Sequence, residues 1–165
     1  MYPAGVEYFK SQGFENVWPF LPCSFDPSLH YPDPTIDRMY DISFVGAFLH
    51  PIHRQRTSWL YEVAKMAELY KIAFFDWILE PPQSADLLRQ SRIIFNHSYR
   101  GELNILSFEA MASGALLFLE DTNIDVKDHF EDGVHYISYN RSNYRDRLKY
   151  YLTHEDERQR IAAES

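Results

Sequence analysis

Cysteine is almost absent from this sequence of 165 residues, which contains only Cys23. A single thiol cannot form an internal disulfide and has no second cysteine with which to share a metal ion, so disulfide scaffolds and cysteine-cluster zinc sites are excluded. No stretch approaches the roughly eighteen apolar residues that a membrane helix needs, and the first residues lack the basic start and apolar core of a signal peptide. We therefore expect a cytoplasmic protein.

Concentrated positive charge is missing as well. The chain has 16 basic and 24 acidic residues, and its net charge of −8 argues against nucleic acid as a partner, because a phosphate backbone needs a basic surface. Glycine is scarce, and neither a Walker-type loop nor a dinucleotide fingerprint is present. His50 and His53 have a proline between them and no third ligand nearby, and no Asp-x-Asp pair ends a strand. We expect no metal site.

The residues that are abundant indicate one globular domain. Apolar residues make up 45% of the chain and aromatic residues 16%, while the length is too short for two ordinary domains. Prolines gather between Pro19 and Pro34, which is typical of a linker. We therefore divide the chain into residues 1–38, a linker or the remnant of a preceding domain, and residues 39–165, an α/β domain.

Strand-length apolar runs alternate with helical periodicity from residue 40 onward. After a short helix at 6–12, strands are expected at 40–46, 71–75, 92–95, 115–119 and 134–139, and helices at 57–70, 82–90, 105–113, 125–131, 144–152 and 155–163. Asn104 is the predicted N-cap of the helix that Gly114 ends. Repeated strand-helix units favour an open, doubly wound parallel sheet over a β-sandwich or a helical bundle.

One carboxylate stands out in this pattern. Glu109 lies in the middle of an apolar helix, between Phe108 and Ala110. Such a group is costly to bury unless hydrogen-bond donors or a cation meet it. The hydroxyl pair of a nucleotide ribose would provide two donors, whereas the simpler alternative is a solvated helix residue with apolar neighbours.

Several segments together resemble a known family. They are the strand YDISFVG at 40–46 followed by a loop with Arg54, the segment FEAMASGA at 108–115, and FEDG at 130–133. The chain resembles, over residues 18–163, the C-terminal domain of GT-B glycosyltransferases of the group 1 type, including the spore-maturation-protein-like branch. The resemblance implies a Rossmann-like domain that binds a nucleoside-diphosphate sugar, with Glu109 on the ribose and the helix start, Leu103, Asn104 and Ile105, facing the diphosphate.

The diphosphate needs further partners, because the sequence departs from the family at two places. Glu102 and Glu109 are one residue closer together than the family's acidic pair, and Ser107 stands where the spore-maturation-like pattern has an arginine. Arg54, Arg56 and Arg100 are the candidates for neutralising the phosphates. The loop at Gly46 completes the predicted donor site, and Trp77 is a candidate to flank the base at the carboxyl edge of the sheet.

The resemblance also says what this chain lacks. GT-B enzymes place the acceptor, and usually the catalytic base, on a separate N-terminal domain, so no catalytic residue is assigned here. We expect a metal-independent domain that needs no cofactor besides its donor substrate and leaves the acceptor, whether glycan, protein or lipid, to the missing domain. Self-association into a homo-oligomer would cover its apolar ends. The alternative is a non-catalytic interaction or scaffold module derived from the same fold.

Overall fold

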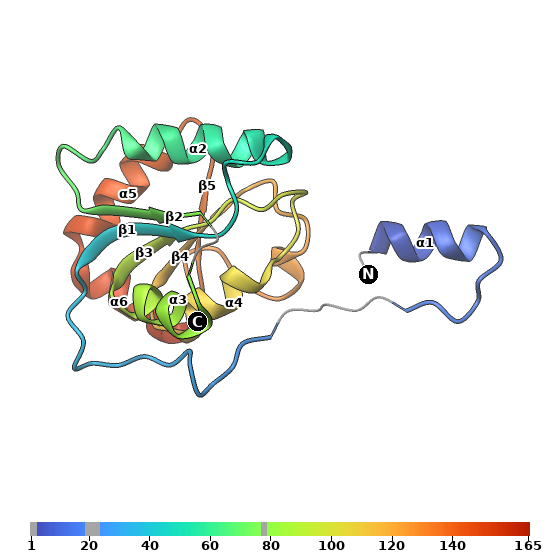
Figure 1. The fold of residues 1–165 in the computed structure, drawn as a ribbon, viewed down its shortest axis with the longest axis horizontal. Helices are drawn as coiled ribbons and strands as arrows, with labels where there is room; N and C mark the ends of the chain where they lie inside the picture. Colours follow the sequence, from blue (N-terminus) through green and yellow to red (C-terminus); the bar gives the residue numbers. More distant parts are fainter. Residues whose placement is uncertain (1–2, 19–23, 77–78) are drawn as a thin grey trace.

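The computed structural model describes residues 3–18, 24–76 and 79–165 (Figure 1). At its centre is a sheet of five parallel strands in the order β2-β1-β3-β4-β5. These strands are β1 (Tyr40–Val45), β2 (Ile72–Phe75), β3 (Ser91–Phe95), β4 (Leu116–Glu120) and β5 (Ile137–Tyr139). The predicted open, doubly wound parallel sheet is confirmed.

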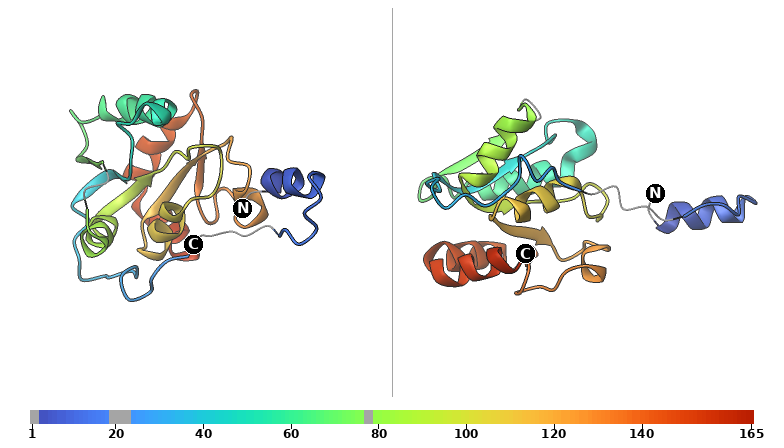
Figure 2. Two further views of the ribbon diagram at one scale, coloured as in Figure 1. Left: turned by 45° about the vertical axis from the view of Figure 1, so that its right-hand side comes forward. Right: turned by 90° about the horizontal axis from the view of Figure 1, so that it is seen from below.

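Helices cover both faces of the sheet, as right-handed crossovers between parallel strands require (Figures 1 and 2). Helices α3 (Pro81–Arg89) and α4 (Ile105–Ala112) pack against each other on one face. On the other face lie α2 (Arg54–Ala64) and α5 (Tyr144–Thr153), whose Trp59 and Tyr144 rings are 5.4 Å apart, and α6 (Glu155–Glu164) packs on α5 and β4. No helix among the described residues is both long and apolar enough to cross a membrane.

The core lies along the two middle strands. The side chains of Ile93, Ile94 and Phe95 in β3, and of residues 116–119 in β4, are fully buried. Continuous apolar runs of this kind are what a strand needs when helices cover both of its faces. The carboxyl ends of β1, β3, β4 and β5 consequently share one edge, where ligands of open α/β sheets bind.

Three predicted elements are shorter in the structure because their ends form tight turns. Helix α2 ends at Ala64 rather than residue 70, since the amides of Met66 and Ala67 donate to carbonyls three residues back. The predicted helix 125–131 is the 3₁₀ turn η2 (Val126–Asp128). The predicted strand 134–139 begins only at Ile137, because Val134 and His135 donate their amides to the carbonyl of Glu131.

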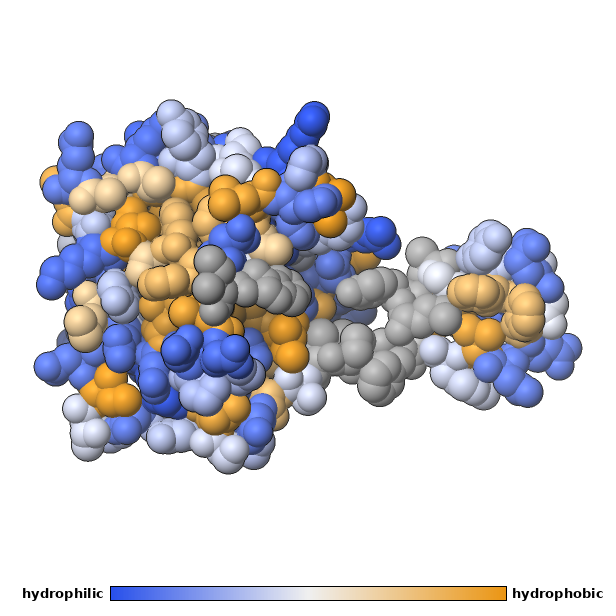
Figure 3. All heavy atoms as spheres, viewed as in Figure 1, coloured by the Kyte–Doolittle hydropathy of each residue, from blue (hydrophilic) through white to orange (hydrophobic). Residues whose placement is uncertain are grey.

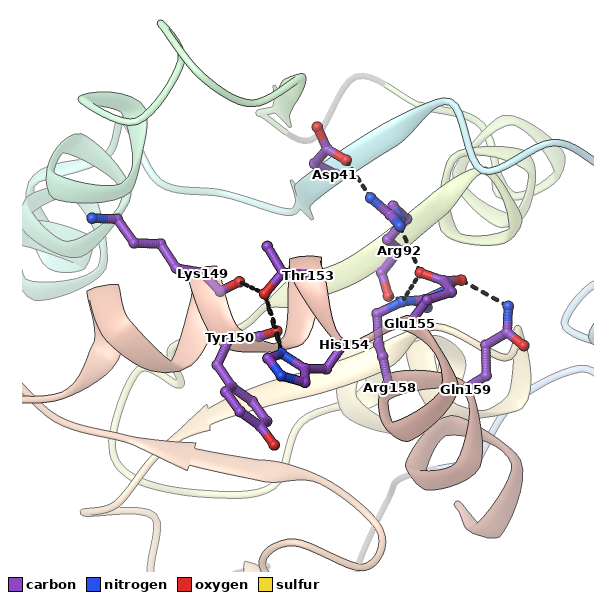
Figure 4. Close-up of polar contacts among 9 residues, drawn as sticks. All are labelled: Asp41, Arg92, Lys149, Tyr150, Thr153, His154, Glu155, Arg158 and Gln159. Atoms are coloured by element: carbon purple, nitrogen blue, oxygen red, sulfur yellow. Dashed lines mark hydrogen bonds and ion pairs between the residues drawn. The ribbon is translucent and has the colours of Figure 1, made fainter.

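An ion-pair network closes the opposite, amino-terminal edge of the sheet (Figure 4). Arg92 in β3 lies between Asp41, 3.1 Å away in β1, and Glu155 at the start of α6. Arg158, which is 2% exposed, donates to the carbonyl of Arg92 at 3.0 Å. Partial burial opposes the ionisation of Glu155, but hydrogen bonds from Arg158 and Arg92 lower its pKa to about 2. These contacts fix α6 to the sheet.

The segment before the sheet, residues 24–38, lies across the ends of α3 and α4, and we call it the strap (Figure 1). Arg38 donates from Nη1 to the carbonyls of Ser91 (2.8 Å) and Leu88 (3.3 Å), and from Nη2 to those of Gly114 (2.8 Å) and Ser113 (3.3 Å). Gly114 has φ +70°, and a Cβ there would come within 3.0 Å of Pro32 and Arg38. The glycine is thus required by the close approach of the strap as well as by the helix end.

Helix α1 (Pro3–Ser11) stands apart from the sheet (Figure 1). Apolar side chains gather on this part of the molecule (Figure 3), and Phe9, Phe14 and Trp18 are exposed. The sequence correctly predicted a short helix here, although it begins three residues earlier than expected.

Replacing Arg38 with Ala should lower the free energy of unfolding by about 2 to 3 kcal/mol, because four carbonyls, at the ends of α3 and α4 and at the start of β3, lose a charged donor. Denaturant unfolding measures the loss, and the exposed Arg160→Ala is the matched control. Arg38→Lys should recover only part of the stability, since an ammonium group cannot span both sets of carbonyls. Equal stability of Arg38→Ala and Arg160→Ala would contradict this role for the strap.

Candidate functional site

Helix α4 begins at the carboxyl edge of the sheet with the predicted N-cap. The Oδ1 atom of Asn104 accepts the amide of Ser107 at 3.3 Å and the Nδ2 of Asn96 at 2.8 Å. Asn96, which follows β3, also donates to the hydroxyl of Ser107 at 3.0 Å. The cap is therefore held in place by the strand before it, and the start of the helix cannot fray independently of the sheet.

The amides at this helix start are partly used by the protein. The amide of Leu103 donates to Oδ2 of Asp125 at 3.3 Å, so a carboxylate stands at one of the groups predicted to face a diphosphate. Ile105, the first residue of the helix, is 52% exposed. The positive end of the helix dipole is thus open to solvent on the side of Ile105, where it suits an anion.

Glu109 lies one turn after Ile105 on the same side of α4. Its side chain is 21% exposed, and burial raises the pKa of its carboxyl group. Oε1 is 3.4 Å from Nε2 of His30, a strap residue that is 4% exposed and whose Nδ1 is 3.4 Å from the hydroxyl of Ser113. The simpler alternative, a solvated helix residue, does not describe this environment. The predicted ribose carboxylate is half-buried, with a histidine that the sequence did not reveal as its neighbour.

The three candidate arginines occupy different environments. Arg56 is 9% exposed and donates from Nε to the carbonyl of His97 (2.6 Å) and from Nη1 to that of Ala47 (2.7 Å). Its guanidinium also lies over the ring of Phe44, at 5.3 Å, and burial lowers its pKa. Arg56 thus ties the loop after β1 to the loop after β3 from inside. Arg54 and Arg100 are exposed.

Arg54 and Arg100 share the rim of a hollow of about 340 Å³. The hollow lies between the residues that begin α2 and the loop after β3, and His53 and Tyr99 also line it. The Nδ1 atom of His53 is buried and makes no hydrogen bond with any described residue. We call this the arginine hollow. It offers positive charge at the carboxyl edge of the sheet.

Gly46 and Trp77 are the two remaining residues of the predicted donor site, and both follow strands in the sequence. Gly46 ends β1 with φ +133°, its amide donates to the carbonyl of Phe75 at 3.0 Å, and a Cβ would lie 3.4 Å from the ring of Phe44. A glycine is required there because other residues rarely adopt this conformation. Trp77 lies outside the described residues.

A buried polar cluster at the ends of β3, β4 and β5 was missed by the sequence analysis. Glu120, 3% exposed, accepts the amide of Ser98 at 3.1 Å and its hydroxyl, and burial raises the pKa of this carboxyl group. His97 Nδ1 is 3.6 Å from Glu120 and 3.3 Å from the hydroxyl of Tyr139. The available signal was a charged residue directly after the buried run ALLFL, opposite a histidine that follows the run IIF.

Metal ligands do not gather at these sites. Within the ranges that the structure describes, no three His, Cys, Asp or Glu side chains are placed to hold a metal ion together. His50 and His53 have ring centroids 6.4 Å apart. The residues available for an anionic ligand are therefore arginines and amides.

His97 should make folding stability depend on pH. Burial, assisted by the charges of Arg56 and Arg141, lowers its pKa from 6.5 to about 4, while Glu120 and Tyr139 lie beside its Nδ1. Because the unfolded chain takes up this proton first, the stability is present above pH 6.5 and is lost as the pH falls toward 4. The loss amounts to about 3 kcal/mol.

Denaturant unfolding across this pH range compares the parent with His97→Gln, which should lose part of the pH dependence. The exposed His129→Gln is the matched control and should keep it. An NMR titration that placed the pKa of His97 near 6.5 would show that the imidazole is solvated, contrary to this expectation.

Known structures resemble this fold at low sequence identity. The C-terminal domain of a glycosyl transferase group 1 family protein (LpcC) from Francisella tularensis matches 86% of this chain and 94% of its own, with a TM-score of 0.63 and 16% identity. Anabaena HepE in complex with UDP-glucose matches 86% of this chain and 49% of its own (TM-score 0.59, 11% identity). Sucrose-phosphate synthase from Thermosynechococcus elongatus matches 86% of this chain and 45% of its own, with a TM-score of 0.62 and 11% identity.

The chain therefore spans about half the length of the last two proteins, 49% and 45%. Among curated proteins no sequence match is found. A family model described as "Glycosyl transferase-like" matches residues 38–165, which include the whole sheet and all the residues that line the arginine hollow. Nothing in these matches singles out the spore-maturation-like branch, which stays a prediction. On the family match, this chain belongs to the glycosyl transferase-like family.

Proposed function

We propose that this domain binds the nucleoside-diphosphate sugar donor of a GT-B glycosyltransferase. The observation that carries the proposal is the half-buried Glu109 in α4, one turn from a helix start that lies at the same edge of the sheet as the arginine hollow. A ribose diol would give Glu109 the two donors that a carboxylate lacks. The solved HepE complex contains UDP-glucose, which makes UDP-glucose the first ligand to test.

The diphosphate is assigned to the start of α4 and to the exposed Arg54 and Arg100. Neither guanidinium group has a carboxylate partner among the described residues. Arg56, by contrast, donates to the carbonyls of His97 and Ala47 and so holds their two loops together. Arginines and helix amides stabilise negative charge on a leaving diphosphate without a metal ion. Neutralisation without a metal and without a cofactor is part of this proposal.

The acceptor is assigned to another domain. This chain holds one strand-helix series and no catalytic residue that the resemblance would carry over, so we propose that it binds the donor while transfer needs a partner domain that holds a glycan, protein or lipid acceptor. The cytoplasm is the proposed compartment, which suits a chain without paired cysteines. Self-association through the exposed apolar residues of the N-terminal segment also belongs to this proposal.

The scaffold alternative is less well supported. It requires a carboxyl edge closed by the protein's own residues, for example by the loop that carries Arg54. That loop instead borders the arginine hollow, and its buried His53 Nδ1 has no described partner. An open, positively charged hollow favours a ligand site.

Glu109→Gln should weaken UDP-glucose binding by about 1 to 3 kcal/mol, because the substitution keeps the shape but removes the charge that strengthens hydrogen bonds from the ribose. Titration calorimetry measures the affinity, and the exposed Glu68→Gln is the matched control. Folding should change little. If Glu109→Gln binds within about twofold of the parent, the ribose assignment is wrong.

Substitutions of Arg54 and Arg56 distinguish an arginine that contacts the phosphates from one that holds the loops in place. Arg54→Ala should weaken UDP much more than uridine, and the difference should shrink as salt rises. Arg56→Ala should weaken both ligands alike, because it releases the loops that shape the site. Arg160→Ala should change neither. Equal weakening of UDP and uridine by Arg54→Ala would assign this residue to the loop structure instead of the diphosphate.

A further inference from the structure

One residue of the strap is buried although its side chain is polar. His30 is 4% exposed, and its backbone amide donates to the carbonyl of Asp26 at 2.8 Å. An imidazole is costly to bury unless polar groups meet its two ring nitrogens. The groups that face these nitrogens therefore indicate what the side chain does.

Both ring nitrogens of His30 face helix α4. Nε2 is 3.4 Å from Oε1 of Glu109, and Nδ1 is hydrogen-bonded to the hydroxyl of Ser113 at 3.4 Å. Glu109 and Ser113 are four residues apart, and Ser113 is the C-cap of α4, so the two side chains lie one above the other on the same side of the helix. The imidazole bridges them from the strap.

The backbone on either side of His30 is fixed to α3 by one arginine. Arg89, which is 7% exposed, donates to the carbonyl of Leu29, and its guanidinium lies 4.7 Å from the ring centroid of Tyr31. Asp86, one turn earlier in α3, pairs with the same guanidinium. Because both neighbours of His30 are held, its imidazole is kept against α4, as a side chain that orients another one must be.

The contacts of His30 assign its proton to one nitrogen. Burial and the charge of Arg89 lower the pKa of the imidazole, against the opposite effect of Asp26, so it is neutral at physiological pH and carries one proton. The carboxylate of Glu109 can only accept, whereas the hydroxyl of Ser113 can donate. Both contacts are satisfied when the proton is on Nε2, facing Glu109, and Ser113 donates to Nδ1.

This arrangement engages one oxygen of the carboxylate and leaves the other. Oε2 of Glu109 makes no hydrogen bond with any described residue, and the side chain keeps 21% of its surface exposed. The terminal torsion of a glutamate is otherwise broad, and ordering it on binding costs free energy. A donor at Oε1 fixes that torsion before a ligand arrives.

We propose that His30 is a positioning residue for Glu109: its imidazole holds Oε1 and thereby directs Oε2 toward a hydroxyl group of the bound ligand. This role rests on the proposed function, because it takes the ribose of the donor as that ligand. It goes beyond the proposed function by making recognition of the ribose depend on the strap, although His30 itself touches no part of the nucleotide.

The first test compares UDP with 2′-deoxy-UDP, which lacks one ribose hydroxyl, by titration calorimetry on the full chain. The parent should prefer UDP about five- to tenfold. His30→Phe keeps a buried aromatic ring but removes both nitrogens, and it should reduce this preference to less than about twofold. His30→Gln keeps an N–H group that can reach Oε1 and should recover most of it. A merely structural role would weaken both nucleotides equally and leave their ratio unchanged.

The second test needs no nucleotide. A ¹³C NMR titration follows the carboxyl group of Glu109, whose pKa burial already raises. His30→Phe should raise this pKa further, because the ionised form loses its donor, whereas His30→Gln should leave it near the parent value. His129→Phe is the matched control at an exposed position and should change neither this pKa nor the ratio of the two nucleotide affinities.

Ser113→Ala gives a milder disturbance of the same contact, because it removes the partner of Nδ1 and leaves the imidazole in place. It should lower the UDP preference in the same direction, about twofold. If His30→Phe fails to fold, this variant decides, and an unchanged preference would overturn the inference.

Failure of the positioning role and failure of the proposed function give different results. If the parent prefers UDP and Glu109→Gln abolishes the preference, but His30→Phe retains it, the ribose assignment stands and the role of His30 is wrong. A pKa of Glu109 that His30→Phe leaves unchanged would also overturn that role. If the parent binds neither nucleotide, or binds both equally, the ribose assignment fails and the role of His30 fails with it.

Discussion

The buried guanidinium of Arg56 is the constraint on which the carboxyl edge of the sheet depends. A charge at this depth persists only where hydrogen bonds meet it, and here the carbonyls of Ala47 and His97 do so. These carbonyls belong to loops that follow β1 and β3, neighbours at the point where the chain order of the strands reverses. One side chain thereby sets the spacing of the loops that border the arginine hollow.

The sheet could be predicted from the sequence because burial on both faces leaves continuous apolar runs, and because Asn104 and Gly114 mark the ends of α4 by local chemistry. Which of the candidate arginines is buried and which is exposed could not be predicted. Arg54 and Arg56 lie close together in the sequence, yet the direction in which each points depends on where α2 begins, and it begins at Arg54 rather than at Thr57. Because the helix begins three residues earlier than predicted, Arg56 lies within its first turn, on the buried face, instead of in the loop before it.

The candidate site was predicted in part for the same reason. Glu109 is conspicuous because its neighbours in the helix are apolar, but its contact with His30 joins residues far apart in the chain, which no local pattern reveals. His97 and Glu120 likewise meet only because β3 and β4 are paired in register, with Phe95 opposite Phe118. Residues that follow adjacent parallel strands are brought together by the sheet, and their separation in sequence hides the pair.

The strap limits how far the chain can be shortened from its N-terminal side. Arg38 binds the carbonyls at two helix ends, Pro32 packs on Gly114, and His30 lies beside Glu109. A fragment that starts where the sheet starts, at Tyr40, would keep every strand and every helix from α2 onward, yet it would leave four carbonyls without their cation and Glu109 without its histidine. The smallest piece that preserves the chemistry of α4 therefore includes the strap from at least His30 onward, well outside the sheet itself.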